Sequence, residues 1–187
     1  TKEDTATTLF INKTKMIVQD LSNTDSSTRE EAGESFRKLS FTKKDVPLLQ
    51  DAFLKSYHDD SLEYASTIHQ LENKLEETGD SSNIAFVRQH YYSLPDSSRR
   101  KMLMIKLLSA QNTSSAVLLI KELLLTSPPI LGSEYTFIYN LKDSLALAQS
   151  MFPESAKLFT NSLFGDGLIS LAVTLADSGY IDNELFK

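Results

Sequence analysis

The most apolar stretch of this chain, residues 102–125, is the feature that most limits what the chain can fold into. Read at 100° per residue, residues 102–108 surround most of a helix with apolar side chains, so that only Arg99 and Lys106 share a narrow strip open to water. A helix with so little polar surface needs neighbours on several sides. The stretch therefore predicts helices packed against helices.

A second helix is predicted at residues 114–126, after a polar break at residues 111–113. Most of its apolar residues gather on one face, but Leu118 and Leu125 lie off that face. We interpret these two leucines as contacts to the next helix along the chain, as in a stacked array.

The same helical period runs through nearly the whole chain, because apolar residues recur every three or four positions and long alternating patterns are missing. We therefore predict an all-α fold, with only residues 130–138 ambiguous. The expected helices cover residues 5–21, 26–39, 43–57, 61–77, 81–92, 97–109, 114–126, 134–139, 144–151, 154–163 and 168–177.

Composition excludes several classes of protein. The 187 residues contain no cysteine, which rules out disulfides, thiolate metal ligands and a cysteine nucleophile but leaves the compartment open, extracytoplasmic or cytoplasmic. The net charge of -6 and the estimated pI of 5.1 oppose binding to nucleic acid. The basic run Arg99-Arg100-Lys101 is too short to change this, and we interpret it as a solvated helix start.

No segment of the sequence has the length and apolarity of a transmembrane helix, which needs about 20 apolar residues, so we expect a soluble module. The first residues, TKEDTATT, carry no signal-peptide pattern, and the last, GYIDNELFK, stop within an apolar pattern. We expect the chain to be a fragment of a longer protein with flanking domains.

Asp followed by Ser recurs at most of the predicted breaks between helices. Aspartate can cap the first turn of a helix by accepting hydrogen bonds from its free amide groups, so we expect a helix to start after each such step. The exception is Asp177, which we expect to close the last helix before Gly179. The other steps begin at Asp25, Asp60, Asp80, Asp96 and Asp143.

Three of these steps are almost evenly spaced, since Asp60 lies 35 residues after Asp25 and Asp96 lies 36 residues after Asp60. A period of this length is typical of helical repeats. The first unit, VQDLSNTD followed by REEAGESFRKL, resembles the HEAT-type repeat of α-solenoids, with Asp25, Arg29 and Ala32 at the positions of that family's aspartate turn, arginine and small residue.

The resemblance covers roughly residues 5–126 and departs from the family in places. Tyr64 replaces the arginine in the second unit, and Leu103 is large where the family has a small residue in the third. Beyond Thr126 the period fails. Pro128 and Pro129 should end the helix there, leaving an irregular end region at residues 127–187.

The sequence contains no pattern that names a reaction. Its three histidines, His58, His69 and His90, never occur four residues apart on one helix, so we predict no metal site. No Gly-x-Ser-x-Gly pentad is present, and we interpret residues 165–167, Gly-Asp-Gly, as a tight turn. We predict no cofactor and no enzymatic activity.

The predicted fold is thus an α-solenoid of about five antiparallel helical hairpins in a single helical-repeat domain, residues 1–187. Stacked repeats leave an extended binding surface, so we expect a scaffold or a protein- or peptide-binding module. An enzyme domain whose site forms only in three dimensions, or a passive spacer between domains, is the alternative.

Candidate contacts to a partner come from two sources. The family's arrangement implies that the second helix of each pair lines the binding surface, and aromatic residues anchor many interfaces. The residues Tyr135, Phe137 and Tyr139 form a further alternating run in which at most one face can be buried. The candidate partner-binding residues are Arg29, Arg99, Arg100, Lys106, Tyr91 and Tyr92.

Overall fold

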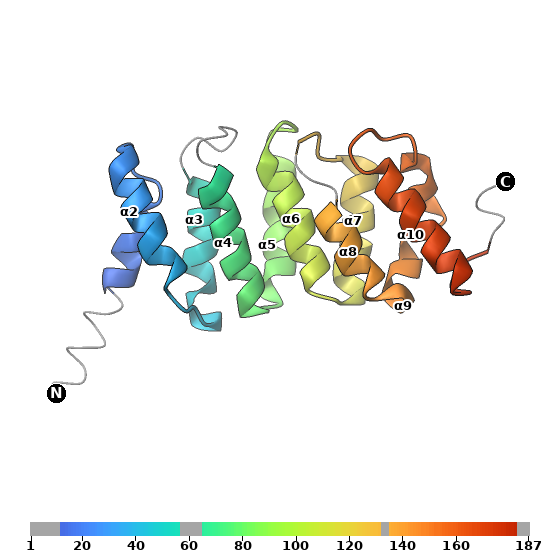
Figure 1. Ribbon diagram of the computed structural model, residues 1–187, viewed down its shortest axis with the longest axis horizontal. Coiled ribbons are helices and arrows are strands. Elements are labelled where there is room, and N and C mark those ends of the chain that lie inside the picture. Colours follow the sequence, from blue (N-terminus) through green and yellow to red (C-terminus); the bar gives the residue numbers. More distant parts are fainter. Residues whose placement is uncertain (1–11, 57–64, 132–134, 183–187) are drawn as a thin grey trace. The chain divides into compact units, whose positions relative to one another are not determined.

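The computed structural model describes residues 12–56, 65–131 and 135–182, and every regular element in those ranges is a helix (Figure 1). The predicted all-α fold class is therefore confirmed for the described residues. None of their helices is long and apolar enough to cross a bilayer.

The first described helix covers residues 12–20. The α-helices that follow are α2 (Ser26–Arg37), α3 (Val46–Lys55), α4 (Ala65–Thr78), α5 (Ser82–His90), α6 (Arg99–Ala110), α7 (Ser114–Thr126), α8 (Tyr135–Lys142), α9 (Leu145–Ala148) and α10 (Gly165–Asp177). Short 3-10 helices are η1 (Lys43–Asp45), η2 (Tyr91–Ser93), η3 (Gln149–Met151) and η4 (Glu154–Leu158).

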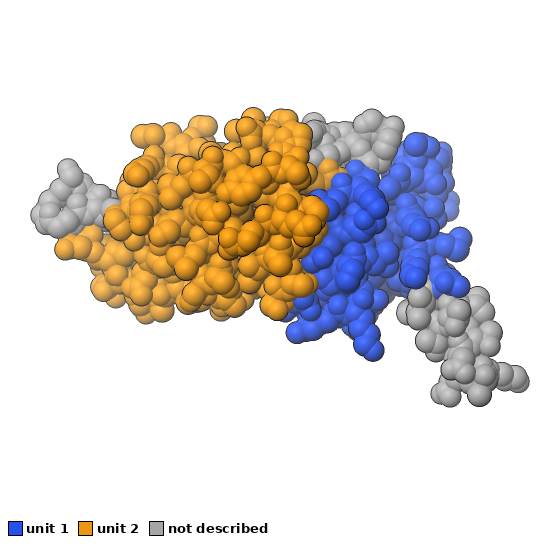
Figure 2. Space-filling model, turned by 180° about the vertical axis from the view of Figure 1, so that it is seen from behind, with its two compact units in different colours: residues 1–80 blue, residues 81–187 orange. Residues whose placement is uncertain are grey.

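The chain divides into two compact units, Thr1–Asp80 and Ser81–Lys187, which are coloured separately in Figure 2. In the first unit α3 packs along α4, and Phe36, Phe53 and Leu71 are fully buried. The second unit has its own core, which includes Met104 and Phe137. Each unit therefore buries a set of large apolar side chains.

Within the second unit the helices form two layers (Figure 1). In one layer α6 packs against α8, and α8 packs against α10. In the other layer α7 packs against α5, η3 and η4. The contacts of α6 with α5, α7 and α8 confirm that this apolar helix has neighbours on several sides.

The boundaries of α7 agree with the sequence prediction. Thr113 precedes the helix, and its hydroxyl accepts a hydrogen bond from the amide of Ala116 at 3.3 Å. The helix ends at Thr126, before Pro128 and Pro129, as predicted. The end of α10 at Asp177 is also confirmed, and Gly179 follows with a φ of 75°.

That positive φ completes a specific helix ending. The amide of Tyr180 donates to the carbonyl of Leu175 at 2.8 Å, and the amide of Gly179 donates to Ala176 at 3.0 Å. These two bonds make up a Schellman motif, which favours glycine because the left-handed conformation crowds a Cβ atom.

The Asp-Ser steps are helix caps less often than predicted. Asp25 does cap α2, since its carboxylate accepts from the Thr28 amide at 2.8 Å. Asp96 does not cap α6, because Ser98 is the N-cap and accepts from Arg100. At α9 the N-cap is Ser144, which makes no side-chain cap bond. Asp60 lies outside the described residues.

The region before α10 also differs from the prediction. The helix expected at residues 154–163 is limited to η4, and the predicted turn at residues 165–167 is the first turn of α10. Asn161 explains the difference, because its side-chain Oδ1 accepts from the amides of Leu163 at 2.8 Å and Phe164 at 3.2 Å. A side chain that bonds to nearby backbone amides in this way competes with the helical hydrogen bonds of the preceding segment and satisfies amide groups just before the next helix.

The prediction that α7 also touches helices further along the chain is confirmed by its packing against η3, η4 and α9, but Leu118 is 48% exposed and so is not buried in such a contact. Leu125, by contrast, is partly buried. The off-face position of Leu118 on α7 therefore faces water.

Candidate functional site

Three residues converge around the buried Lys101, and we refer to Tyr91, Asp96, Lys101 and Ser127 together as the Lys101 cluster. Lys101 lies in the first turn of α6, and only 1% of the residue is exposed. Its Nζ donates to Asp96 Oδ1 at 2.5 Å and to Ser127 Oγ at 2.8 Å. It also lies 5.0 Å from the centroid of the Tyr91 ring.

The other members of the Lys101 cluster bond to one another. The Tyr91 hydroxyl donates to the carbonyl of Ser127 at 2.8 Å, and Ser127 Oγ donates to Asp96 Oδ1 at 3.2 Å. The cluster therefore joins η2, the start of α6 and the end of α7. It corrects the interpretation of Arg99-Arg100-Lys101 as a solvated helix start, since Arg100 and Lys101 are buried.

The electrostatics of the Lys101 cluster follow from these contacts. The hydrogen bond and the charge of Lys101 hold the pKa of Asp96 below its ordinary value of 3.8, and the Ser127 hydroxyl adds to this effect. Burial raises the pKa of Tyr91, and the neighbouring Tyr92 and Asp96 raise it further. The result is a charged pair beside a neutral phenol.

The Ser127–Lys101 contact has the spacing of a serine nucleophile and its base, but its bonding is unsuited to that chemistry. A general base must accept a proton from the serine. Lys101 instead donates to both Asp96 and Ser127, as an ammonium group does. The Ser127 proton is directed to Asp96. We therefore interpret the Lys101 cluster as a structural clasp.

Three of the six candidate partner-binding residues are buried. Arg29 Nη1 donates to the carbonyl of Asn23 and so holds the turn before α2. Arg100 is 4% exposed, and burial lowers its pKa from 12.5 to about 10. Tyr91 belongs to the Lys101 cluster. Because these side chains serve internal packing, we do not include them in the binding surface proposed below.

The other three candidates are accessible, but Tyr92 in η2 lies on a different helix from Arg99 and Lys106. Arg99 and Lys106 are partly exposed on α6, as the strip predicted for water requires. Tyr92 is 50% exposed, and its hydroxyl lies 2.9 Å from Thr126 Oγ1 and donates to Glu122 Oε1 at 3.3 Å. Tyr92 is thus fixed against α7, in the layer away from the exposed strip of α6.

Among the aromatic residues of the second unit whose exposure is described, Tyr139 is the most exposed, with 62% of the residue open to solvent. It lies on α8, between α6 and α10 in the same layer. The neighbouring Phe137 is 1% exposed, so the expectation that only one face of this run is buried holds for the two residues whose side chains are described. We call the solvent side of these three helices the α6–α8–α10 face.

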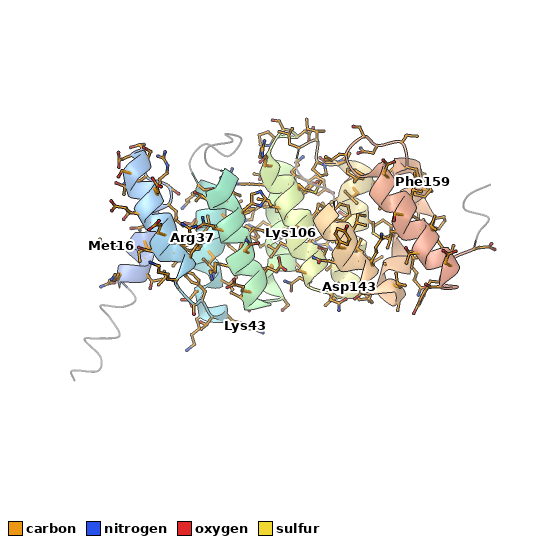
Figure 3. The ribbon with its side chains drawn as sticks, viewed as in Figure 1. Met16, Arg37, Lys43, Lys106, Asp143 and Phe159 are labelled. Carbon is orange, nitrogen blue, oxygen red and sulfur yellow. The ribbon has the colours of Figure 1, made fainter. Side chains whose placement is uncertain are left out.

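Hydrogen bonds and close packing fix the register of this face. Asn140 Nδ2 donates to Ser109 Oγ on α6 at 2.9 Å, and Lys142 Nζ donates to Ser170 Oγ on α10 at 2.8 Å. A Cβ atom added to Gly167 would lie 3.0 Å from Ile138 Cγ1, so α10 approaches α8 closely at that point. Lys106 on α6 and Asp143 after α8 can be followed in Figure 3.

Charge is unevenly distributed over the face. Helix α6, RRKMLMIKLLSA, contains basic and no acidic residues, whereas α10, GDGLISLAVTLAD, contains acidic and no basic ones. Asp166 in the first turn of α10 is exposed. Tyr139 therefore lies on a helix between Lys106 of α6 and Asp166 of α10, while Lys142 of α8 adds a cation that is bonded to Ser170 of α10.

Within the described ranges, no group of three or more histidine and carboxylate side chains is placed to hold a metal ion. His58, the histidine beside Asp59 and Asp60, lies outside those ranges. Comparison with protein families, curated proteins and solved structures found no match to this chain.

Proposed function

We propose that this chain is a helical-repeat module that holds a protein or peptide partner and has no catalytic role of its own. The observation that carries the proposal is the exposure of Tyr139 in the middle of the α6–α8–α10 face. Tyrosine combines a large apolar ring with a polar hydroxyl and is enriched among the residues that dominate binding energy. A tyrosine residue that is 62% exposed offers an anchor for a partner.

The hydrogen bonding of the Lys101 cluster supports a scaffold function and not an enzymatic one. In the Lys101 cluster each polar side chain already has a partner within the cluster. Catalytic groups must instead present a proton, a lone pair or a charge to a substrate. The Lys101 cluster stabilises the shape of the unit that displays Tyr139.

HEAT-type stacking is part of the same proposal. Its support is local: Asp25 caps α2, Ala32 is buried three residues after Arg29, and successive helices of the second unit alternate between two layers. Repeat arrays bury a core by such stacking and leave broad faces for binding. The α6–α8–α10 face is the part of the surface that we assign to this role.

A photo-cross-linking experiment tests the proposed function. p-Benzoylphenylalanine is introduced in place of Tyr139 in the full-length protein in its native cells, and in a control variant in place of Leu118. Leu118 is a suitable control because it is exposed on α7, in the other layer. We expect a discrete protein adduct from position 139 and none from position 118.

Binding of the cross-linked protein is then measured by calorimetry with purified components. The Tyr139→Ala variant should lose about 2 kcal/mol of binding free energy, or roughly thirtyfold in Kd, as expected of an interface anchor. Leu118→Ala should bind like the wild type. Equal binding by wild type and Tyr139→Ala would remove the support for this face, and a passive spacer would then be the better description.

A further inference from the structure

We propose that the α6–α8–α10 face binds an extended polypeptide segment carrying an acidic residue, an apolar residue and a basic residue in a row, with about three residues from each to the next. This inference rests on the proposed function and specifies the chemistry of the partner. It follows from three residues that cross the face, Lys106, Tyr139 and Asp166, which we call the Tyr139 row.

The register of the helices places the Tyr139 row together. Lys106 lies one turn before Ser109, whose hydroxyl bonds to Asn140, the residue after Tyr139. Asp166 adjoins Gly167, which packs on Ile138, the residue before Tyr139. All three helices belong to one layer. The row therefore crosses the layer within about one helical turn, or about 5 Å, of a single level.

The charges of the Tyr139 row determine what complements it. Lys106 is partly exposed and also interacts with other residues of the chain. It therefore contributes a positive potential to the face, without being reserved for an ion pair with the partner. Asp166 supplies a negative charge at the other end. A partner matches this order with a carboxylate over α6, an apolar side chain on the Tyr139 ring, and a cation over α10.

The spacing of the helices determines the spacing in the partner. Packed helices lie about 8–10 Å apart, so α6 and α10 are separated by roughly 16–20 Å across α8. In a polyproline II segment every third side chain points to the same side, and six residues span about 19 Å. Side chains at one position, three residues on and six residues on therefore reach the three members of the row.

Selection from a displayed library of random twelve-residue peptides tests this inference, with the full chain as the immobilised protein. The wild-type protein should enrich peptides in which an apolar or aromatic residue is flanked, three residues to either side, by one acidic and one basic residue. A peptide chosen from this selection should bind the Tyr139→Ala variant roughly thirtyfold more weakly than the wild type.

Charge reversals make the test independent of the direction in which a peptide binds. Lys106→Glu leaves carboxylates at both ends of the row and should shift the enriched peptides to two basic flanks. Asp166→Lys leaves cations at both ends and should shift them to two acidic flanks. Each reversal should weaken the wild-type-selected peptide by roughly three- to tenfold, as for exposed ion pairs. Leu118→Ala is the matched control and should select the same peptides as the wild type.

A lysine at the start of α10 opposes the helix dipole, so thermal unfolding of each variant is recorded and Asp166→Asn serves as a milder second variant. Asp166→Asn should relax the requirement for a basic flank without creating an acidic one. Enrichment of peptides whose charges do not follow these substitutions would overturn the inference but leave a peptide-binding function. Failure to enrich any peptide on wild type over Tyr139→Ala would overturn both.

Discussion

Gly165, at the start of α10, and Gly33, inside α2, differ in whether the structure leaves room for a side chain. A Cβ atom on Gly165 would lie 2.3 Å from the carbonyl oxygen of Phe159, so a side chain there would force η4 and α10 apart. A Cβ atom on Gly33 in α2 would meet only the Gln70 side chain, at 3.8 Å, which is an ordinary contact. Glycine is therefore required at the first position and merely permitted at the second.

Alanine substitutions should separate these two cases. We expect Gly165→Ala to lower the free energy of unfolding by about 1–3 kcal/mol, because a close backbone contact must be relieved. Gly33→Ala should raise it by about 0.5–1 kcal/mol, because alanine loses less backbone entropy in a helix. Urea unfolding followed by circular dichroism measures both. A neutral Gly165→Ala variant would contradict the close approach of η4 to α10.

The Asp96–Lys101 pair predicts a dependence of stability on pH. The pKa of Asp96 is lower in the folded chain than its ordinary value of 3.8. Stability gained from the Asp96 carboxylate is therefore present above about pH 4 and is lost as the pH falls through the folded pKa. Asp96→Asn should flatten the decline in unfolding free energy between about pH 4 and pH 2.

The slope should not vanish, since Asp25 and Glu154 also have lowered pKa values. Lys101→Met provides the complementary variant. Because methionine removes the buried charge along with its need for a partner, this variant should unfold within about 1 kcal/mol of the wild type at pH 7. Asp96→Asn at the same pH should be less stable than Lys101→Met, since it leaves a buried ammonium without its carboxylate. The opposite order would argue against the Lys101 cluster as a clasp.

For single residues, the sequence shows which side chains are charged but not where their bonding partners lie. Lys101 stands in a basic run that reads as solvated, yet its hydroxyl partner, Ser127, is 26 residues away along the chain. Nothing local marks that contact. The sequence singles out Tyr139 as part of an alternating run, whereas the proposed row with Lys106 and Asp166 depends on the packing of α6, α8 and α10.

At the scale of elements, the period of apolar residues predicts most helices because each buries one face in a core. The boundaries of α7 follow from residues inside the segment, namely the Thr113 cap and the two prolines after it. The shortened η4 was not predictable in the same way. The apolar pattern continues after η4, but the helix does not, because the side-chain Oδ1 of Asn161 accepts hydrogen bonds from the amides of Leu163 and Phe164 and so changes the direction of the backbone.

This role of Asn161 leads to a prediction for α10. Phe164, the N-cap residue of the helix, makes no side-chain cap bond, and its amide instead donates to the side-chain Oδ1 of Asn161. Asn161→Ala should lower the free energy of unfolding by about 1 kcal/mol, as loss of a cap does. Asn161→Asp should retain the stability, because a carboxylate accepts the same bonds near the positive end of the helix dipole. Thermal unfolding of the three proteins compares them directly, and equal melting of Asn161→Ala and wild type would refute the cap.

At the scale of the whole molecule, the division into two compact units predicts that the second can fold alone. Its core residues and the whole of the Lys101 cluster lie within Ser81–Lys187. A fragment of residues 81–187 should be helical and unfold in one cooperative transition, with an unfolding free energy of about 5 kcal/mol or more. Circular dichroism during urea unfolding tests this, and a gradual transition would show that residues 1–80 are needed for the fold.

Gly167 has a consequence for recognition as well as for packing. Because Gly167 has no side chain, the backbone of α10 packs closely on the side chain of Ile138 in α8. A larger residue at 167 would push α10 away from α8 and so increase the distance between Asp166 and Tyr139. A bound peptide would then have to span a longer distance between these two residues. Under the binding mode proposed above, a single hydrogen atom in place of a side chain thus sets how many residues separate a partner's acidic group from its basic one.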